Sequence, residues 1–190
     1  MVVLKINNVS FNVFCYADDL MLASLSVTGL QNMIEVSSRY IRNHGLRFNP
    51  QKTNCVIFGN RTLSPHPDWS LDSVRLAECD SVSYLGVILS SSNPNEHITN
   101  RINACRKAFY GLQGAGFSNS NIDSNVLSYV WNAAIRPVLT YGINCVHVSK
   151  SSLNEAEKIQ AKLLKAGFGI HKFCRNTPFL KALNVMTIEK

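Results

Sequence analysis

Two adjacent carboxylates, Asp18 and Asp19, are the first acidic residues of this 190-residue sequence. They stand between short apolar runs at residues 11–15 and 20–24, which predict the strands of a hairpin with Tyr16-Ala-Asp-Asp19 as its turn. Adjacent like charges beside apolar strands repel each other and lose water, and a divalent cation removes that cost. Carboxylate oxygens suit Mg²⁺, and a pair of such ions supports in-line phosphoryl transfer. The alternative is an ordinary surface turn rich in Asp.

The elements that hold this turn are predicted to be short strands and one helix. A capping box, Thr28-Gly-Leu-Gln31, opens the helix, and Gly45 stops it. Residues at helical spacing define its inner face: Leu30, Met33, Ile34, Ser37, Tyr40 and Ile41. Beyond the helix we expect a strand at 53–58, a proline-containing loop at 60–73, and a second hairpin from 74–76 and 84–89.

The chain is predicted to be helical after a serine-rich linker at residues 90–92. Asn93 and Pro94 are typical of a helix start, and the helix that follows has one apolar face: Ile98, Ile102, Cys105, Phe109 and Leu112. A second helix is expected over 122–135, up to Pro137. A third begins at the box Ser152-x-x-Glu155 and buries Leu153, Ala156, Ile159 and Leu163. This third helix also carries a separate basic stripe: Lys158, Lys162 and Lys165.

The formal net charge of +7 is unevenly distributed. Residues 1–80 hold seven basic and seven acidic residues, whereas residues 81–190 hold twelve basic and five acidic residues. This asymmetry favours a polyanion such as nucleic acid as a partner of the second half, although solvated helix faces are also basic in many proteins. The composition is globular, with 46% hydrophobic residues, and no apolar run reaches the roughly 18 residues of a membrane span.

Six cysteines lie far apart in the sequence and form no Cys-x-x-Cys pair. Because the N-terminus is too quickly polar for a secretory signal, we expect reduced thiols and an intracellular protein. Cys145-x-His147 and His171-x-x-Cys174 have a spacing that fits no common zinc finger. Buried thiols and surface imidazoles are therefore expected at these two places.

Four segments, in this order, resemble the reverse transcriptases of LINE-type non-LTR retrotransposons, a class of transposable element. Phe14-Cys-Tyr16-Ala-Asp-Asp19 resembles the family's catalytic hairpin, and residues 45–53 resemble its Gly-Leu-x-x-Asn-x-x-Lys-Thr segment. Tyr84-Leu-Gly-Val-Ile88 is similar to the primer-grip hairpin, and residues 135–142 are similar to the thumb. One short motif would be a weak signal, but four ordered matches over about residues 11–145 are a strong one.

The resemblance implies an α+β fold and an RNA-directed DNA polymerase, a nucleotidyltransferase that uses two metal ions. Residues 1–92 would form part of the polymerase palm, with β-hairpins and a helix, and residues 93–190 a mainly α-helical thumb-like region. The implied cofactor is Mg²⁺, which Mn²⁺ can replace. The implied partners are an RNA template, a DNA primer and a dNTP, with no membrane.

Roles follow by resemblance, one position at a time. Asp18 would be the principal metal ligand and Asp19 the second acid, with Tyr16 packed near the nascent base pair. Lys52 would lie near the triphosphate, as a general acid or a fixed charge. The remaining roles are to hold the primer end (Tyr84, Leu85 and Gly86) and to contact the nucleic-acid backbone (Lys158, Lys162 and Lys165). Without the resemblance, Lys52 is typical of an ordinary turn, and Tyr84 and Leu85 are typical of a core hairpin. The three lysines at 158, 162 and 165 are then typical of a solvated helix face.

The family's third catalytic carboxylate, which comes well before the hairpin, has no counterpart here, since residues 1–17 hold no Asp or Glu. We therefore expect a fragment that is inactive alone, whose missing partner is the upstream palm and fingers portion of the same polyprotein. Without that portion, the hairpin at 11–24 would expose apolar edges. Two alternatives stay open: a nonenzymatic RNA- or DNA-binding module, and a retrotransposon remnant with no stable fold.

Overall fold

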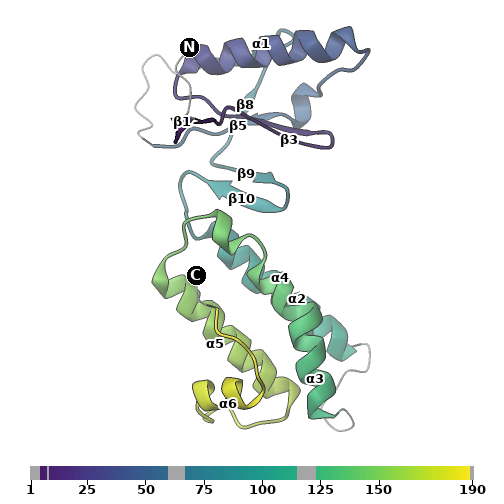
Figure 1. Cartoon of the computed structure of the whole chain (residues 1–190), viewed down its shortest axis with the longest axis vertical. Coiled ribbons are helices and arrows are strands. Elements are labelled where there is room, and N and C mark those ends of the chain that lie inside the picture. The colour runs from purple at the N-terminus through teal and green to yellow at the C-terminus, as the bar shows by residue number, and fades with distance from the viewer. Residues whose placement is uncertain (1–4, 8, 60–66, 115–122, 189–190) are drawn as a thin grey trace. The chain divides into compact units, whose positions relative to one another are not determined.

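The computed structural model describes residues 5–7, 9–59, 67–114 and 123–188, which form two compact units, residues 1–92 and 93–190 (Figure 1). The first unit mixes small sheets with a helix, and the second is helical, which agrees with an α+β class. Elements of the first unit are β1 (Lys5–Ile6), β2 (Val9–Ser10), β3 (Val13–Tyr16), β4 (Asp19–Leu22), α1 (Val27–Asn43), η1 (Pro50–Lys52), β5 (Asn54–Cys55), β6 (Ser70–Leu71), β7 (Val74–Arg75), β8 (Ala77–Glu78), β9 (Ser81–Tyr84) and β10 (Val87–Ser90). Those of the second are α2 (Glu96–Gly114), α3 (Ser124–Val130), η2 (Trp131–Ile135), α4 (Arg136–Thr140), η3 (Ile143–Cys145), α5 (Lys150–Gly167) and α6 (Asn176–Ala182).

Within the described part of the first unit, the strands pair only in twos. The antiparallel pairs are β1–β2, β3–β4, β6–β7 and β9–β10, and β5 pairs with β8 in parallel. The predicted hairpin around the two acids is confirmed as β3–β4. The predicted pairing of residues 74–76 with 84–89 is wrong, because β7 pairs with β6 and β10 pairs with β9. Two-residue turns with positive φ close both of these hairpins locally, at 72–73 and 85–86.

Helix α1 covers one side of the small sheets (Figure 1) and packs on a core of Ile34, Cys55, Trp69, Leu71 and Leu76. Its N-cap is Ser26, whose Oγ accepts a hydrogen bond from the Gly29 amide, and not the expected Thr28. The side chain of Gln31, assigned to the capping box, instead bonds the backbone of Ser70 at 3.0 and 3.1 Å. A long-range pairing of Gln31 with a strand therefore replaces the reciprocal bond expected of the capping box.

The inner face of α1 also differs from the expected one at its C-terminal end. Tyr40 is 65% exposed, whereas Ser38 is buried and its Oγ donates to the Asp72 carboxylate at 2.8 Å. Asp72 in the turn between β6 and β7 therefore contacts the helix through the small polar side chain of Ser38. The predicted end of the helix is confirmed, since α1 stops at Asn43 and Gly45 has a φ of +74°.

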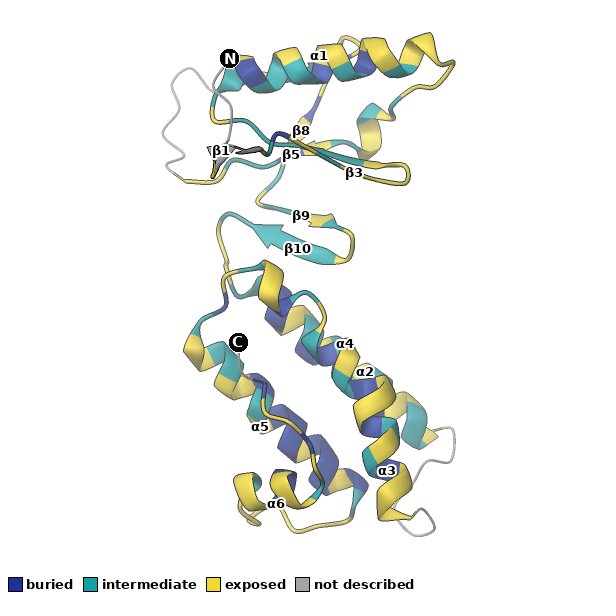
Figure 2. Cartoon of the chain, in the orientation of Figure 1, coloured by how far each residue is buried: buried dark blue, intermediate teal, exposed yellow. Residues whose placement is uncertain are grey.

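The helices of the second unit bury most of the predicted stripes, which appear as dark segments along α2 and α5 in Figure 2, and Leu112 and Leu153 are partly buried. Ile98, Ile102, Cys105 and Phe109 of α2 are all buried. Among the described residues, eighteen buried hydrophobic residues form the core of this unit, against five in the first. The N-cap of α5 is Ser149, three residues before the expected Ser152, and its Oγ accepts from the Ser152 amide.

The chain stays helical through Pro137, where we expected the helix to end. The π-helical turn η2 joins α3 to α4, with the Arg136 amide bonded to the Trp131 carbonyl five residues earlier. Proline lacks an amide hydrogen and its ring crowds the preceding turn of an α-helix. A wider π turn directly before Pro137 lets the helix continue through Thr140.

All six cysteines are free thiols, but their burial differs from our expectation. Cys145 and Cys174, predicted to be buried, are exposed, because η3 and the segment after α5 lie at the surface of the unit. Cys55 and Cys105 are buried, and burial raises the pKa of each thiol to about 11. The described helices include none that is long and apolar enough to span a membrane.

Candidate active site

The hairpin β3–β4 presents its polar residues at its tip. Tyr16 ends β3 directly opposite Asp19, the first residue of β4, and Ala17 and Asp18 form the two-residue turn. Ala17 has a φ of +50°, a left-handed conformation that costs a non-glycine residue about 1 kcal/mol. Tyr16 is 65% exposed, and both carboxylates are exposed. The hairpin therefore carries a phenol and two carboxylates outward on a short, closed loop.

The base of the same hairpin is tied to the body of the first unit. The Asn12 side chain donates to the Ala23 carbonyl at 2.9 Å, and the Ala23 amide donates to the Asn12 carbonyl at 2.8 Å. Leu22 at the end of β4 packs against the core beside Val27 and Leu30 of α1. These contacts fix the direction of the hairpin while its tip stays free to meet a ligand.

The two acids suit a divalent metal ion as part of its ligand set. Neither side chain forms a hydrogen bond or ion pair with the described residues, so four hard carboxylate oxygens are available. No group of three or more His, Cys, Asp or Glu side chains lies together in the parts that the structure describes. Magnesium commonly takes one or two protein carboxylates and completes its shell with water and phosphate oxygens. Asp18 and Asp19 fit that pattern.

The structure gives a local reason for the spacing of the Asn49-Pro-Gln-Lys52-Thr53 segment. The Asn49 side chain accepts from the Gln51 amide at 3.0 Å, and its carbonyl accepts from the Lys52 amide at 3.1 Å and the Thr53 hydroxyl at 2.9 Å. Phe48, just before it, packs against the core of the first unit. Asn49 thus caps the single turn η1, which presents Lys52 to solvent.

Tyr84, Leu85 and Gly86 form the closed end of the hairpin β9–β10. Tyr84 pairs with Val87 across the turn, and Leu85 and Gly86 have φ values of +49° and +74°. A turn with two positive φ values favours Asn-Gly or Gly-Gly, so Leu85 holds an unfavourable conformation. Strained residues of this kind concentrate at functional sites. Leu85 is 36% exposed at this apex.

The expected basic stripe on α5 is corrected at its last member. Lys158 and Lys162 are exposed one turn apart, whereas Lys165 is only 5% exposed. The Lys165 ammonium donates to the Lys172 carbonyl at 3.3 Å, to the Cys174 carbonyl and to the Asn176 side chain. The chain after α5 folds back over the end of the helix and buries this residue, which the helical spacing alone does not reveal.

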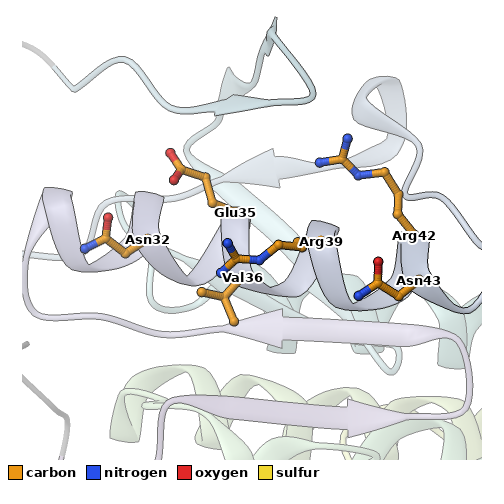
Figure 3. A pocket seen from close by; sticks show the side chains of 6 residues that line it. All are labelled: Asn32, Glu35, Val36, Arg39, Arg42 and Asn43. Atoms are coloured by element: carbon orange, nitrogen blue, oxygen red, sulfur yellow. The ribbon is translucent and has the colours of Figure 1, made fainter.

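A polar surface on the outer side of α1 was not predicted from the sequence (Figure 3). All six residues that line this hollow belong to α1: Asn32, Glu35, Val36, Arg39, Arg42 and Asn43. Arg42 is already engaged in an ion pair with Asp72 at 3.2 Å. The i, i+3, i+4 spacing of these residues is the only signal in the sequence, and it is equally typical of an ordinary solvated helix face.

Comparison with known proteins places the acidic hairpin in a family. The model of the family "Reverse transcriptase (RNA-dependent DNA polymerase)" matches residues 2–89. These residues are similar to the reverse transcriptase family. The family match contains every predicted site residue of the first unit, from Tyr16 to Gly86. Three of the four segments that carried the resemblance lie within this match, which confirms the resemblance for residues 2–89.

Two relatives from Drosophila melanogaster extend the similarity into the second unit. The chain is 26% identical over 178 residues to the RNA-directed DNA polymerase from mobile element jockey, covering 90% of this chain and 19% of that protein. It is also 26% identical over 184 residues to the probable RNA-directed DNA polymerase from transposon BS, covering 92% of this chain and 20% of that protein. The chain thus spans about a fifth of the length of these curated relatives. No solved structure matches it significantly.

Proposed function

We propose that this chain supplies part of the palm and the helical thumb of an RNA-directed DNA polymerase. The observation that carries the proposal is the hairpin tip, where Tyr16, Asp18 and Asp19 are exposed together within the family match. The substrates would be a DNA primer on an RNA template and a dNTP, and the reaction a nucleotidyl transfer. Residues 1–92 would be the palm portion and residues 93–190 the thumb portion.

Asp18 and Asp19 would hold Mg²⁺, or Mn²⁺ in its place, through their carboxylate oxygens. When bound, the metal neutralises the developing charge on the attacking and leaving oxygens. Tyr16 lies across the hairpin from Asp19, so its ring would pack against the base pair that forms beside the carboxylates. The hairpin contributes mainly by positioning, which is most of what phosphoryl transfer requires of a protein.

The other assigned residues would orient the two substrates. The exposed ammonium of Lys52 would lie against the triphosphate and stabilise or protonate the pyrophosphate. Tyr84, Leu85 and Gly86 would hold the primer end at the closed end of β9–β10. Lys158 and Lys162 would contact phosphates of the template–primer, each adding a salt-dependent and sequence-independent contribution. Lys165 is left out of this set because it is buried.

The 190-residue chain alone would bind nucleic acid without extending a primer. Its hairpin offers two adjacent carboxylates, and residues 1–17 contain no acid that could act as the third. With one ligand fewer, the metal and the reacting oxygens are poorly positioned, and rate depends steeply on such positioning. A palm and fingers portion of the same polyprotein would supply the missing carboxylate and the nucleotide site.

A chimeric polymerase tests the proposal. Residues 2–89 replace the matching segment of the jockey polymerase, and primer extension is measured on an RNA template with Mg²⁺ or Mn²⁺. We expect extension by the chimera and none by its Asp18→Asn variant. The matched control is Asp68→Asn, which removes an exposed carboxylate paired with Arg75 and should leave extension unchanged. A folded chimera that is inactive, or an Asp18→Asn chimera that still extends, would refute the proposal.

A further inference from the structure

The segment between α5 and α6, residues 168–175, exposes an aromatic ring to solvent. We call this segment the α5–α6 loop; it is largely coloured as exposed in Figure 2. Phe173 in this loop is 79% exposed, more than any other large hydrophobic side chain in the described parts of the chain. Leaving a phenylalanine in water forgoes most of the free energy that its burial would contribute. The ring is therefore accessible to a ligand that presents a flat aromatic face.

A lysine and a histidine side chain lie beside this ring. The Lys172 ammonium lies 5.2 Å from the centre of the Phe173 ring, and the His171 ring lies 5.1 Å from it. The sequence around the loop is strongly basic, since residues 158–188 contain six Lys or Arg residues and no Asp or Glu. An exposed aromatic ring within a field of positive charge matches the two chemical features of a nucleic-acid strand, the base faces and the phosphates.

The loop is held in place by contacts that fix the ring. The buried Lys165 ammonium donates to the carbonyls of Lys172 and Cys174, on either side of Phe173. The Cys174 amide donates to the His171 carbonyl at 3.0 Å, which closes a backbone turn that contains Phe173. Because the backbone is already ordered, a ligand that stacks on Phe173 does not have to order it first.

We infer that Phe173 is a stacking platform for an unpaired base of a single-stranded nucleic acid, with Lys172 beside it for a flanking phosphate. Every base has a π face, so stacking on Phe173 would tolerate any sequence. RNA and DNA single strands share this chemistry. The inference deepens the proposed function, because a polymerase that copies a template must hold unpaired strand away from the reaction.

A tryptophan in place of Phe173 would report stacking directly. The two native tryptophans, Trp69 and Trp131, are buried, so in the full-length Phe173→Trp variant the new indole is the exposed one. We expect its fluorescence to be quenched by a 12-nucleotide uridine RNA, a thymidine DNA of equal length, or both, and the stronger quencher identifies the strand. An abasic strand of the same length and charge should bind without quenching. Equal quenching by the abasic strand, or no quenching by any strand, would overturn the inference.

Affinity measurements give a second, independent readout. Phe173→Ala should weaken binding of the RNA or DNA 12-mer by about 5- to 100-fold, the range expected for one stacked base. Its affinity for the abasic strand should not change. Phe58→Ala is the matched control, because Phe58 is also exposed, at 59%, but lies in the first unit. Unchanged binding in Phe173→Ala, or equal weakening in Phe58→Ala, would contradict a stacking site.

These variants do not touch the acidic hairpin, so the two proposals fail separately. Loss of extension in the chimera, with indole quenching intact in the Phe173→Trp variant, would refute the polymerase assignment only. Extension that depends on Asp18, together with unchanged oligonucleotide affinity in Phe173→Ala, would refute the stacking site only.

Discussion

Replacing Lys165 with methionine tests how the α5–α6 loop is held. Methionine keeps most of the length and apolar contact of the lysine side chain but removes the ammonium. In the native chain, this ammonium donates three hydrogen bonds, to two carbonyls and to the Asn176 amide oxygen. Hydrogen bonds from a charged donor contribute about 1.5–3 kcal/mol each, whereas burying an ammonium costs several kcal/mol. The two effects largely cancel. We expect a net loss of about 1–3 kcal/mol in Lys165→Met.

The loss should appear as local opening and not as global unfolding. Lys172 and Cys174 are exposed residues, so their carbonyls can recover hydrogen bonds from water if the loop lifts off α5. Amide hydrogen exchange followed by mass spectrometry should therefore accelerate about 5- to 150-fold in peptides from 168–182. Peptides from the buried face of α2 should change much less.

Lys162→Met is the matched control, because it makes the same chemical change on the same helix at an exposed lysine. It should alter stability by less than about 0.5 kcal/mol. Unchanged exchange in the loop of Lys165→Met would refute the reasoning, and so would an equal acceleration in Lys162→Met.

Three further predictions concern other parts of the structure. Gln160→Leu should destabilise the second unit by about 3 kcal/mol, which would lower the midpoint of urea unfolding. The reason is that the Trp131 indole N–H and the Met186 carbonyl lose the hydrogen bonds that they now form with Gln160 at 3.3 and 3.2 Å. An unchanged midpoint would contradict this. Leu85→Asn should stabilise the first unit by about 1 kcal/mol in the same assay, since Asn tolerates positive φ, and a loss of stability would count against strain at the turn. Desolvation raises the pKa of Cys105 from 9.0 to about 11, so the unfolded chain releases this proton first and unfolding becomes easier as the pH rises from about 9 toward 11. Cys105→Ala should show a shallower fall in unfolding free energy over that window, and an identical slope would refute the assignment.

Periodic patterns in the sequence were sufficient for the elements whose partners are close in the chain. The hairpin β3–β4 forms as predicted because its two strands are joined by only two residues and need no distant contact to find their register. The buried face of α2 also follows from spacing alone, since Ile98, Ile102 and Cys105 repeat at the helical period.

Helix ends were less predictable because serines and threonines near a helix start compete to cap it. Ser26 caps α1 in place of Thr28, and Ser149 caps α5 in place of Ser152. All four residues have a hydroxyl that can accept from a backbone amide, so local propensity cannot distinguish them. The direction from which the chain enters each helix selects one, and that direction depends on packing.

By itself, the sequence determined the family, the acidic hairpin, the apolar faces of the long helices and the basic character of the second half. All of these follow from residue types and from spacings of a few residues. Only the tertiary structure decided that Lys165 is buried while Lys158 and Lys162 are exposed, and that Gln31 pairs with a strand. Each of these side chains has its environment set by a segment that arrives later in the chain, residues 172–176 for Lys165 and Ser70 for Gln31. Helical periodicity fixes the direction of a side chain, but burial depends on what folds over it.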